Sequence, residues 1–193
     1  MTEQKFRHRA ASHLAAIERS ADGAPVNVLV LSDRGGAGAL GAGVLSGWNR
    51  RGTRPRIQIV THVSVGVLIA PFAFIGLRRD CQLSVALQGE NDPSPLEPRA
   101  FGRLAALAGC SDFRDAPLRS LVDRNVTPAL PRAVAAQAAR GRLLLVATDN
   151  LDSGEIVVWN MGAIAAQGGQ PALTHFRQEL TASASIPGVS RRS

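Results

Sequence analysis

The feature that most constrains this chain is an apolar strand that leads directly into a glycine-rich loop. Residues 26–32 read VNVLVLS, a short run that is typical of a buried strand in a parallel sheet. The loop DRGGAGALGAG follows at once, and residues 41–48 have the pattern of the helix that it leads into. A strand, a glycine loop and a helix in this order are typical of α/β folds.

The same alternation continues along the chain. Further strands are predicted at 56–61, 142–150 and 155–160. Three further helices are predicted: one that ends near Ile75, one over 131–141 and one over 171–185. We expect Gly141 to close the second of these helices and Pro171 to begin the third. The spacing of Leu118, Val122 and Val126 indicates one more helix. Together these segments predict an α/β fold with a largely parallel sheet.

Composition is that of one globular domain. The chain has 193 residues, of which 45% are hydrophobic and 19% charged, and this balance excludes a disordered protein. Its net charge of +7 comes almost wholly from arginine, but the arginines look scattered and only 4% of the residues are aromatic, so we expect no nucleic-acid partner. Its two cysteines have no metal or redox spacing.

The N-terminal segment, residues 1–25, has the pattern of an amphipathic helical extension. Phe6, Ala10, Leu14 and Ile17 fall on one helical face, and the opposite face is basic, which allows contact with a membrane surface. No apolar run reaches the ~18 residues of a membrane span, and no apolar core of a signal peptide follows the basic residues. The location of the protein stays open, with the cytoplasm as the default expectation.

The glycine-rich loop fits three interpretations. Gly36, Gly38 and Gly41 form the spacing G-x-G-x-x-G, which is used in dinucleotide binding. A dinucleotide site also needs an acidic residue near the end of the second strand, and RIQIVTHVS has none. The second interpretation is an oxyanion hole, in which backbone amides face a developing negative charge. The third is a loop whose glycines only allow tight packing.

A serine follows the second predicted strand. Residues 60–74 read VTHVSVGVLIAPFAF, so Ser64 lies between an apolar strand and an apolar helix, with Gly66 two residues later. This is close to G-x-S-x-G, the sharp strand-to-helix turn that exposes a nucleophilic serine, except that His62 takes the place of the first glycine. Ser64 is therefore the candidate nucleophile.

Residues 26–189 resemble the bacterial patatin-like phospholipases. The similar segments are LSDRGGAGALGAGVLSGW, GTRP, VTHVSVGVLIAPFAFIG, NLD, VVWNMGAIA and SASIPGV, in the order that the family has them. The four residues 190–193 form an unrelated basic tail. The resemblance implies a three-layer α/β/α fold with a mostly parallel central sheet, incomplete at its C-terminus.

The resemblance also implies a chemistry. Ser64 would attack the acyl ester of a lipid or a small ester substrate, and the amides around Gly35 and Gly36 would stabilise the oxyanion. His62 and Gly66 would flank the serine in its turn. In this family an aspartate in a D-G-G or D-G-A motif activates the serine, and no metal or other cofactor is needed. The oligomeric state is not indicated.

Three departures from the family affect this chemistry. Asp33 and Arg34 replace two glycines of the loop, and the carboxylate of Asp33 would repel the charge that the loop should stabilise. Ala37 replaces a larger polar residue. The ring of His62 is expected to displace the turn or to rotate Ser64; as an alternative, His62 is a replacement base for Ser64, although side chains two residues apart at this turn would crowd each other.

The fourth departure is the missing acid. After SIPGV the chain reads SRRS, and its one Asp-Gly pair, Asp22-Gly23, precedes the first strand, so we expect a truncated gene product. The expected activity is therefore impaired, and the alternative is a catalytically dead relative or gene fragment that only binds. Ser64, Asp152 and His175 follow the chain order of an α/β-hydrolase triad, but His175 lies in a predicted helix and Asp152 in a predicted turn.

Overall fold

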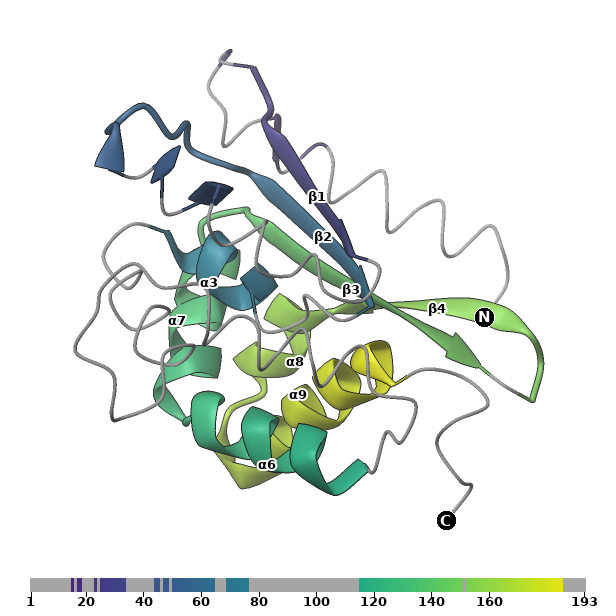
Figure 1. Cartoon of the computed structure of the whole chain (residues 1–193). Coiled ribbons are helices and arrows are strands. Elements are labelled where there is room, and N and C mark those ends of the chain that lie inside the picture. The colour runs from purple at the N-terminus through teal and green to yellow at the C-terminus, as the bar shows by residue number, and fades with distance from the viewer. Residues whose placement is uncertain are drawn as a thin grey trace.

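The protein is a four-stranded sheet with helices packed on it (Figure 1). The computed structural model describes residues 15, 17–18, 23, 25–33, 44–45, 47–48, 50–64, 69–76, 115–150 and 152–185, and for residues 32–33, 64, 115–118 and 121 it describes the backbone alone. The strands are β1 (Val28–Asp33), β2 (Ile59–Ser64), β3 (Leu143–Asn150) and β4 (Glu155–Asn160). Among the described residues, the helices with both ends defined are α3 (Ile69–Ile75), α6 (Asp115–Asn125), α7 (Ala129–Ala138), α8 (Met161–Ala166) and α9 (Gly169–Ala184).

The sheet is mixed, in the order β1-β2-β3-β4. β2 pairs in parallel with both β1 and β3, whereas β3 and β4 are antiparallel. This confirms the predicted α/β class. β3 and β4 are antiparallel because the turn that connects them is short. In this turn the Asn150 side chain accepts hydrogen bonds from the amides of Asp152 at 3.0 Å and Ser153 at 3.3 Å, and Gly154 has a φ of 69°. A parallel return would need a far longer crossover.

Strand β2 lies three residues later than the sequence predicts. It was expected at 56–61 and covers Ile59–Ser64, because it is paired at its last positions: Val63 pairs with Ala147 of β3 and Ser64 with Asp33 of β1. Ser64 is thus the final residue of the strand. The strands predicted at 142–150 and 155–160 are confirmed, and their first and last residues agree with the prediction within one residue.

The predicted helices lie near their expected positions, but two of them begin at earlier residues than predicted. α7 begins at Ala129 and α9 at Gly169, each two residues earlier than expected, so Pro171 is the third residue of α9. Gly141 does have the left-handed φ, 79°, expected after a helix end. Of the N-terminal helix, the structure describes Ala15, Ile17 and Glu18, all helical, with Ile17 buried; Phe6, Ala10 and Leu14 lie outside the described residues.

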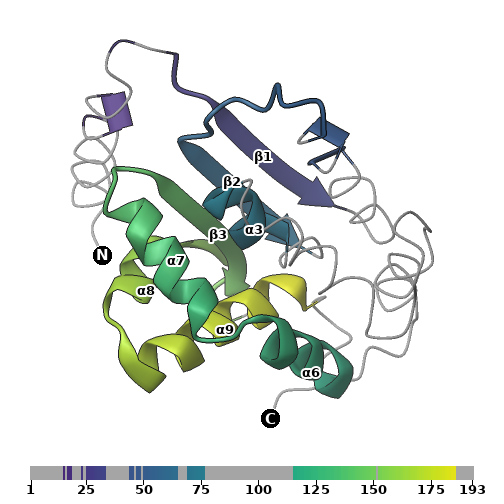
Figure 2. The same ribbon diagram turned by 90° about the vertical axis from the view of Figure 1, so that its left-hand side faces the viewer.

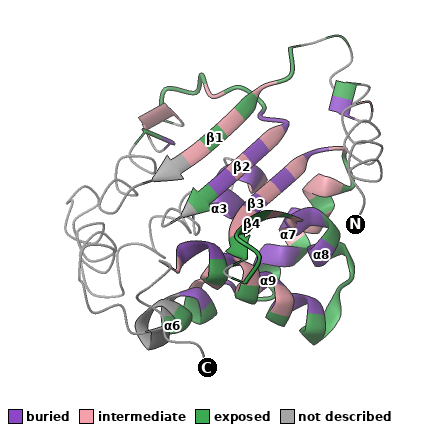
Figure 3. Ribbon diagram, turned by 90° about the vertical axis from the view of Figure 1, so that its right-hand side faces the viewer, coloured by how far each residue is buried: buried purple, intermediate pink, exposed green. Residues whose placement is uncertain are grey.

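The core lies between the sheet and the labelled helices (Figure 2). On this face of the sheet the buried strand residues are Val60, His62, Leu144 and Val146, and α3, α7, α8 and α9 pack against them. The opposite face carries alternate apolar residues that are about half exposed or more, and residues with this exposure are green in Figure 3. These exposed side chains are Val28, Val30, Val63, Ile156 and Val158.

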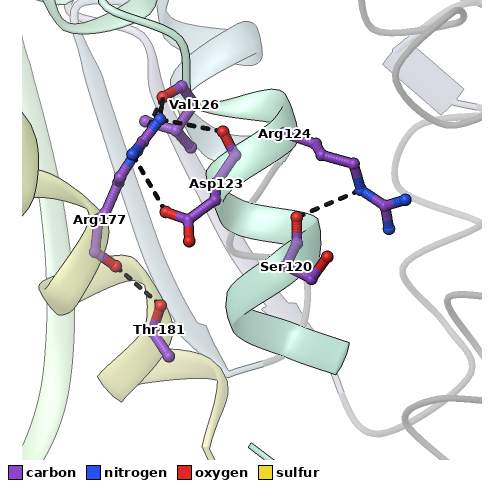
Figure 4. Close-up of polar contacts among 6 residues, drawn as sticks. All are labelled: Ser120, Asp123, Arg124, Val126, Arg177 and Thr181. Atoms are coloured by element: carbon purple, nitrogen blue, oxygen red, sulfur yellow. Dashed lines mark hydrogen bonds and ion pairs between the residues drawn. The ribbon is translucent and has the colours of Figure 1, made fainter. Parts of the chain in front are cut away.

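An arginine joins α9 to the end of α6 (Figure 4). Arg177 Nη2 donates to the carbonyls of Val126 at 2.8 Å and Asp123 at 2.9 Å, and Arg177 Nε also donates to Val126 at 3.0 Å. Its Nη1 forms an ion pair with the Asp123 carboxylate at 3.1 Å. These carbonyls belong to the last turn of α6 and the residue after it, where a helix leaves its acceptors unpaired, so Arg177 caps α6.

Within the described ranges, no helix has the length and apolar character needed to cross a bilayer.

Candidate functional site

The candidate site lies where β1 and β2 end. Both strands run in the same direction, and Asp33 and Ser64, their last residues, are register partners. Neighbouring strands are about 4.8 Å apart, so these two backbones are adjacent. The glycine-rich loop leaves β1 directly after Asp33, which means that it begins beside Ser64. Ligands of α/β sheets bind at this carboxyl edge.

A strand precedes Ser64 and a helix follows it, and these are the two elements that flank a nucleophile turn. Ser64 closes β2, and α3 begins five residues later at Ile69. Every residue of α3 from Ile69 to Phe74 is buried, so this helix packs closely against the sheet. The predicted oxyanion residues Gly35 and Gly36, the predicted turn residue Gly66, and Arg34 and Ala37 lie outside the described residues, and their roles stay predictions.

His62 is buried in the core next to this edge. Its side chain is 1% exposed, and its register partners are Leu31 of β1 and Val146 of β3. The pairing of β2 with β1 continues unbroken through residues 62–64, so the imidazole does not displace the strand. The turn that the ring was expected to displace and the Ser64 side chain that it was expected to rotate lie outside what the structure describes, so that expectation stays a prediction.

The imidazole of His62 is isolated from polar groups. Neither ring nitrogen has a hydrogen-bond partner within the described part of the chain, and burial lowers the pKa of His62 to about 4. A group with this pKa is neutral at pH 7 and a weak proton acceptor. The alternative in which His62 replaces the missing base for Ser64 therefore has no support in this geometry.

Two residues of the alternative triad, His175 and Asp152, have other described contacts. His175 lies on α9, where its Nε2 is 3.3 Å from Oε1 of Glu179, and its ring meets Trp159 edge to face. Asp152 lies in the turn between β3 and β4, as predicted, with its amide bonded to Asn150. His175 thus has a different carboxylate partner, one turn along its own helix.

The Asp-Gly pair at 22–23 is also in the wrong place. Gly23 precedes the amino end of β1, whereas Ser64 lies beside its carboxyl end, a six-residue strand away. The dinucleotide interpretation meets a similar difficulty, because β2 ends at a serine and not at an acidic residue. No group of three His, Cys, Asp or Glu side chains placed to hold a metal ion occurs among the residues that the structure describes.

Sequence reasoning missed one cluster. The arginines looked scattered, but Arg54 and Arg56 precede β2 and Arg140 and Arg142 precede β3, and the two strand starts are neighbours. Arg142 is buried, and the positive charges of the other three act on it. The signal was present as two Arg-x-Arg segments: RPR ends two residues before β2, and RGR directly precedes β3. The expectation of scattered arginines is therefore wrong at this edge of the sheet.

Comparisons with protein-family models, with curated proteins and with solved structures find no match to the chain.

Proposed function

We propose that the protein is a serine acyl hydrolase domain of the patatin-like type, with a three-layer fold, acting on ester bonds of lipids or small esters. The observation that carries the proposal is the register pair Asp33–Ser64. In this pair the candidate nucleophile lies at the carboxyl ends of two parallel strands, beside the start of a glycine-rich loop and ahead of a buried helix. The family-like segments of the sequence support the same assignment.

In this proposal Ser64 attacks the ester carbonyl and forms an acyl-enzyme, which water then hydrolyses. Amides around Gly35 and Gly36 stabilise the oxyanion. The described residues around Ser64 supply no strong base, since His62 is buried with a lowered pKa. We therefore propose a slow enzyme, because an unactivated serine hydroxyl is a poor nucleophile.

The test is hydrolysis of a short-chain p-nitrophenyl ester by the wild type and by Ser64→Ala. A matched control is Ser120→Ala, which removes an exposed hydroxyl on α6. The proposal predicts that Ser64→Ala loses the activity and that Ser120→Ala keeps it. Equal rates for all three proteins would overturn it. Labelling by a fluorophosphonate probe, blocked in Ser64→Ala alone, checks that the serine itself reacts.

A second candidate is a catalytically inactive relative that only binds its lipid. The observation in its favour is His62, because a core histidine with unpaired nitrogens occupies the place of the turn glycine in active relatives. This candidate predicts that vesicle binding is equal in the wild type and Ser64→Ala, while neither protein hydrolyses ester or reacts with the probe.

A further inference from the structure

Strand β4 lies at one edge of the described sheet. The strand order is β1-β2-β3-β4, so β4 pairs with β3 on one side, and the described residues place no strand on its other side. Alternate residues of an antiparallel strand direct their N–H and C=O groups away from the partner, so the outer edge of β4 presents backbone donors and acceptors for a further strand. The β3–β4 pair extends to the right beyond the labelled helices in Figure 1.

The usual protections of an edge strand are missing from β4, which the structure describes in full. Lysine, proline and β-bulges are the common protections, because each of them prevents a further strand from pairing. The sequence of β4 is EIVVWN, and its single charged residue, Glu155, stands at the first position. Its pairing with β3 continues through six successive residues without a bulge. The edge of β4 is therefore open to pairing with another strand.

The face of β4 that points away from the helices is apolar and exposed. Ile156 is 70% exposed and Val158 is 49% exposed. Val158 pairs with Ala147 of β3, whereas Trp159, on the other face, pairs with Val146, which is buried under the helices. Contacts between side chains on neighbouring strands are the main stabilising contacts of a sheet. Ile156 and Val158 would gain such contacts from a strand added at this edge.

The sequence of β4 is complementary to itself in an antiparallel pair. Residues that lie opposite each other in such a pair are on the same face of the sheet, so one residue of the strand must lie opposite its own copy. If that residue is Val157, each Ile156 lies opposite Val158 of the second copy. Both apolar residues that β4 exposes are then paired with an apolar residue.

Neighbouring registers lack this match. With Ile156 opposite its own copy, Val158 would lie opposite Gly154, and with Val158 opposite its own copy, Ile156 would lie opposite Asn160. The register centred on Val157 also keeps like charges apart. The two Glu155 residues are then offset by four positions, or about 13 Å along the strands, so their carboxylates do not lie opposite each other.

We propose that the protein forms a homodimer with twofold symmetry, in which two copies of β4 pair as antiparallel strands with Val157 opposite Val157. The sheets of the two copies then continue into each other. The contact is small, in the class below about 1,200 Å² that gives weak association, so the dimer dissociates on dilution. The inference does not depend on ester hydrolysis, because β3 separates β4 from the strand that carries Ser64.

The first experiment is sedimentation equilibrium of the whole protein over about 1–300 µM, the range in which weak contacts associate. The mass should rise from 20.3 kDa toward twice that value. Ile156→Lys should raise the Kd of the dimer about tenfold or more, since two apolar cross-strand pairs are lost. The fold should be kept, because the lysine would lie opposite the exposed Asp149 of β3.

The matched control is Val30→Lys, which places the same charge on the same face of the sheet at a residue of β1 that is 68% exposed. This variant should keep the Kd of the wild type. A wild type that stays at 20.3 kDa over the whole range would overturn the proposal. An equal loss of dimer in Val30→Lys and Ile156→Lys would also overturn it, because that result indicates that the open faces of two sheets pack together.

The second experiment tests the register by disulfide formation, in a protein whose two native cysteines are replaced by serine. Ile156→Cys and Val158→Cys chains are mixed and oxidised. Opposite residues of an antiparallel pair have Cα atoms about 4.5–5.5 Å apart, which allows a disulfide, whereas two copies of position 156 would be about 7–8 Å apart. The covalent dimer should therefore form in the mixture and far less with either chain alone. A mixture of Val30→Cys and Val158→Cys is the control, and an equal yield of covalent dimer there would refute the proposed pairing.

Discussion

Asp33 pairs with Ser64 at the last position where β1 and β2 run side by side. A residue with a carboxyl group and the candidate nucleophile therefore have adjacent backbones, about 4.8 Å apart. Any substrate held over Ser64 also lies next to the point where the glycine-rich loop leaves β1. This relationship leads to a direct test of the proposed ester hydrolysis.

We predict that Asp33→Gly raises the rate of ester hydrolysis. A carboxylate opposes the oxyanion that forms during attack, since two unit charges about 8 Å apart repel by about 2 kcal/mol at an effective dielectric constant of ~20. Removing that repulsion corresponds to about a thirtyfold gain in kcat/KM. The measurement is the initial rate with a p-nitrophenyl ester, for the wild type and Asp33→Gly.

Two further variants make this result specific. Asp33→Asn removes the charge and keeps the shape of the side chain, so it should show most of the gain. The double variant Asp33→Gly with Ser64→Ala should be inactive. A lower rate in Asp33→Gly would contradict the prediction and would identify Asp33 as a proton acceptor for the serine.

We predict that acid destabilises the fold through His62. Its pKa is about 4 in the folded state against an ordinary value of 6.5, so the unfolded chain takes up the proton first as the pH falls. The free energy of unfolding should therefore decrease from about pH 6.5 down to about pH 4, by an amount on the order of 3 kcal/mol, and then level off. Urea unfolding at a series of pH values measures this.

His62→Leu separates this effect from the other titrating groups. Burial raises the pKa of Glu179, which also titrates in the acid range, but this contribution is common to both proteins and cancels in their difference. Leucine fits the apolar surroundings of Leu31 and Val146 and buries no unpaired nitrogen. The variant should be more stable than the wild type by about 1 kcal/mol at pH 7, and by more at pH 5. A pH-independent difference would refute the prediction.

Much of the fold follows from the sequence because the strands are local apolar runs. The segment EIVVWN was predicted as a strand over 155–160, and it forms β4 over the same residues. A turn precedes this strand, and its last residue, Asn160, caps α8. The start of β2 was predicted too early, because its limits depend on pairing with strands on both sides and not on its own residues. The antiparallel direction of β4 follows from the short loop before it.

The site was less predictable, because it depends on which residues meet. Ser64 was recognised from its neighbours in the chain, but its pairing with Asp33 is a property of the sheet. The isolation of His62 was not predicted, since the sequence does not show that its ring points to the helix-covered face. The arginine cluster was missed because Arg56 and Arg142 are 86 positions apart in the sequence, and only the pairing of β2 with β3 brings their segments together.

We predict opposite effects for alanine at two helical glycines. A Cβ at Gly162 would lie 2.6 Å from the Cβ of Ala138, where α8 packs on α7, so Gly162→Ala should destabilise the protein by about 1–3 kcal/mol. A Cβ at Gly47 would meet nothing within 4 Å, so Gly47→Ala should stabilise it by up to about 1 kcal/mol. Thermal unfolding of both variants measures these effects. A Gly162→Ala protein as stable as the wild type would contradict the packing of α7 against α8, and a destabilised Gly47→Ala protein would contradict the open space at Gly47.

We predict that Arg177 stabilises the fold through carbonyl groups and not through its ion pair. Arg177 donates to the backbone oxygens of Asp123 and Val126, and its carboxylate partner Asp123 is 60% exposed, so the ion pair is worth little. Arg177→Lys should cost about 2 kcal/mol, because one ammonium group cannot reproduce three N–H donors aimed at two carbonyls. Asp123→Asn should cost about 0.5 kcal/mol or less. The midpoint of urea unfolding measures both, and a larger loss in Asp123→Asn than in Arg177→Lys would show that the charge pair is the stabilising contact.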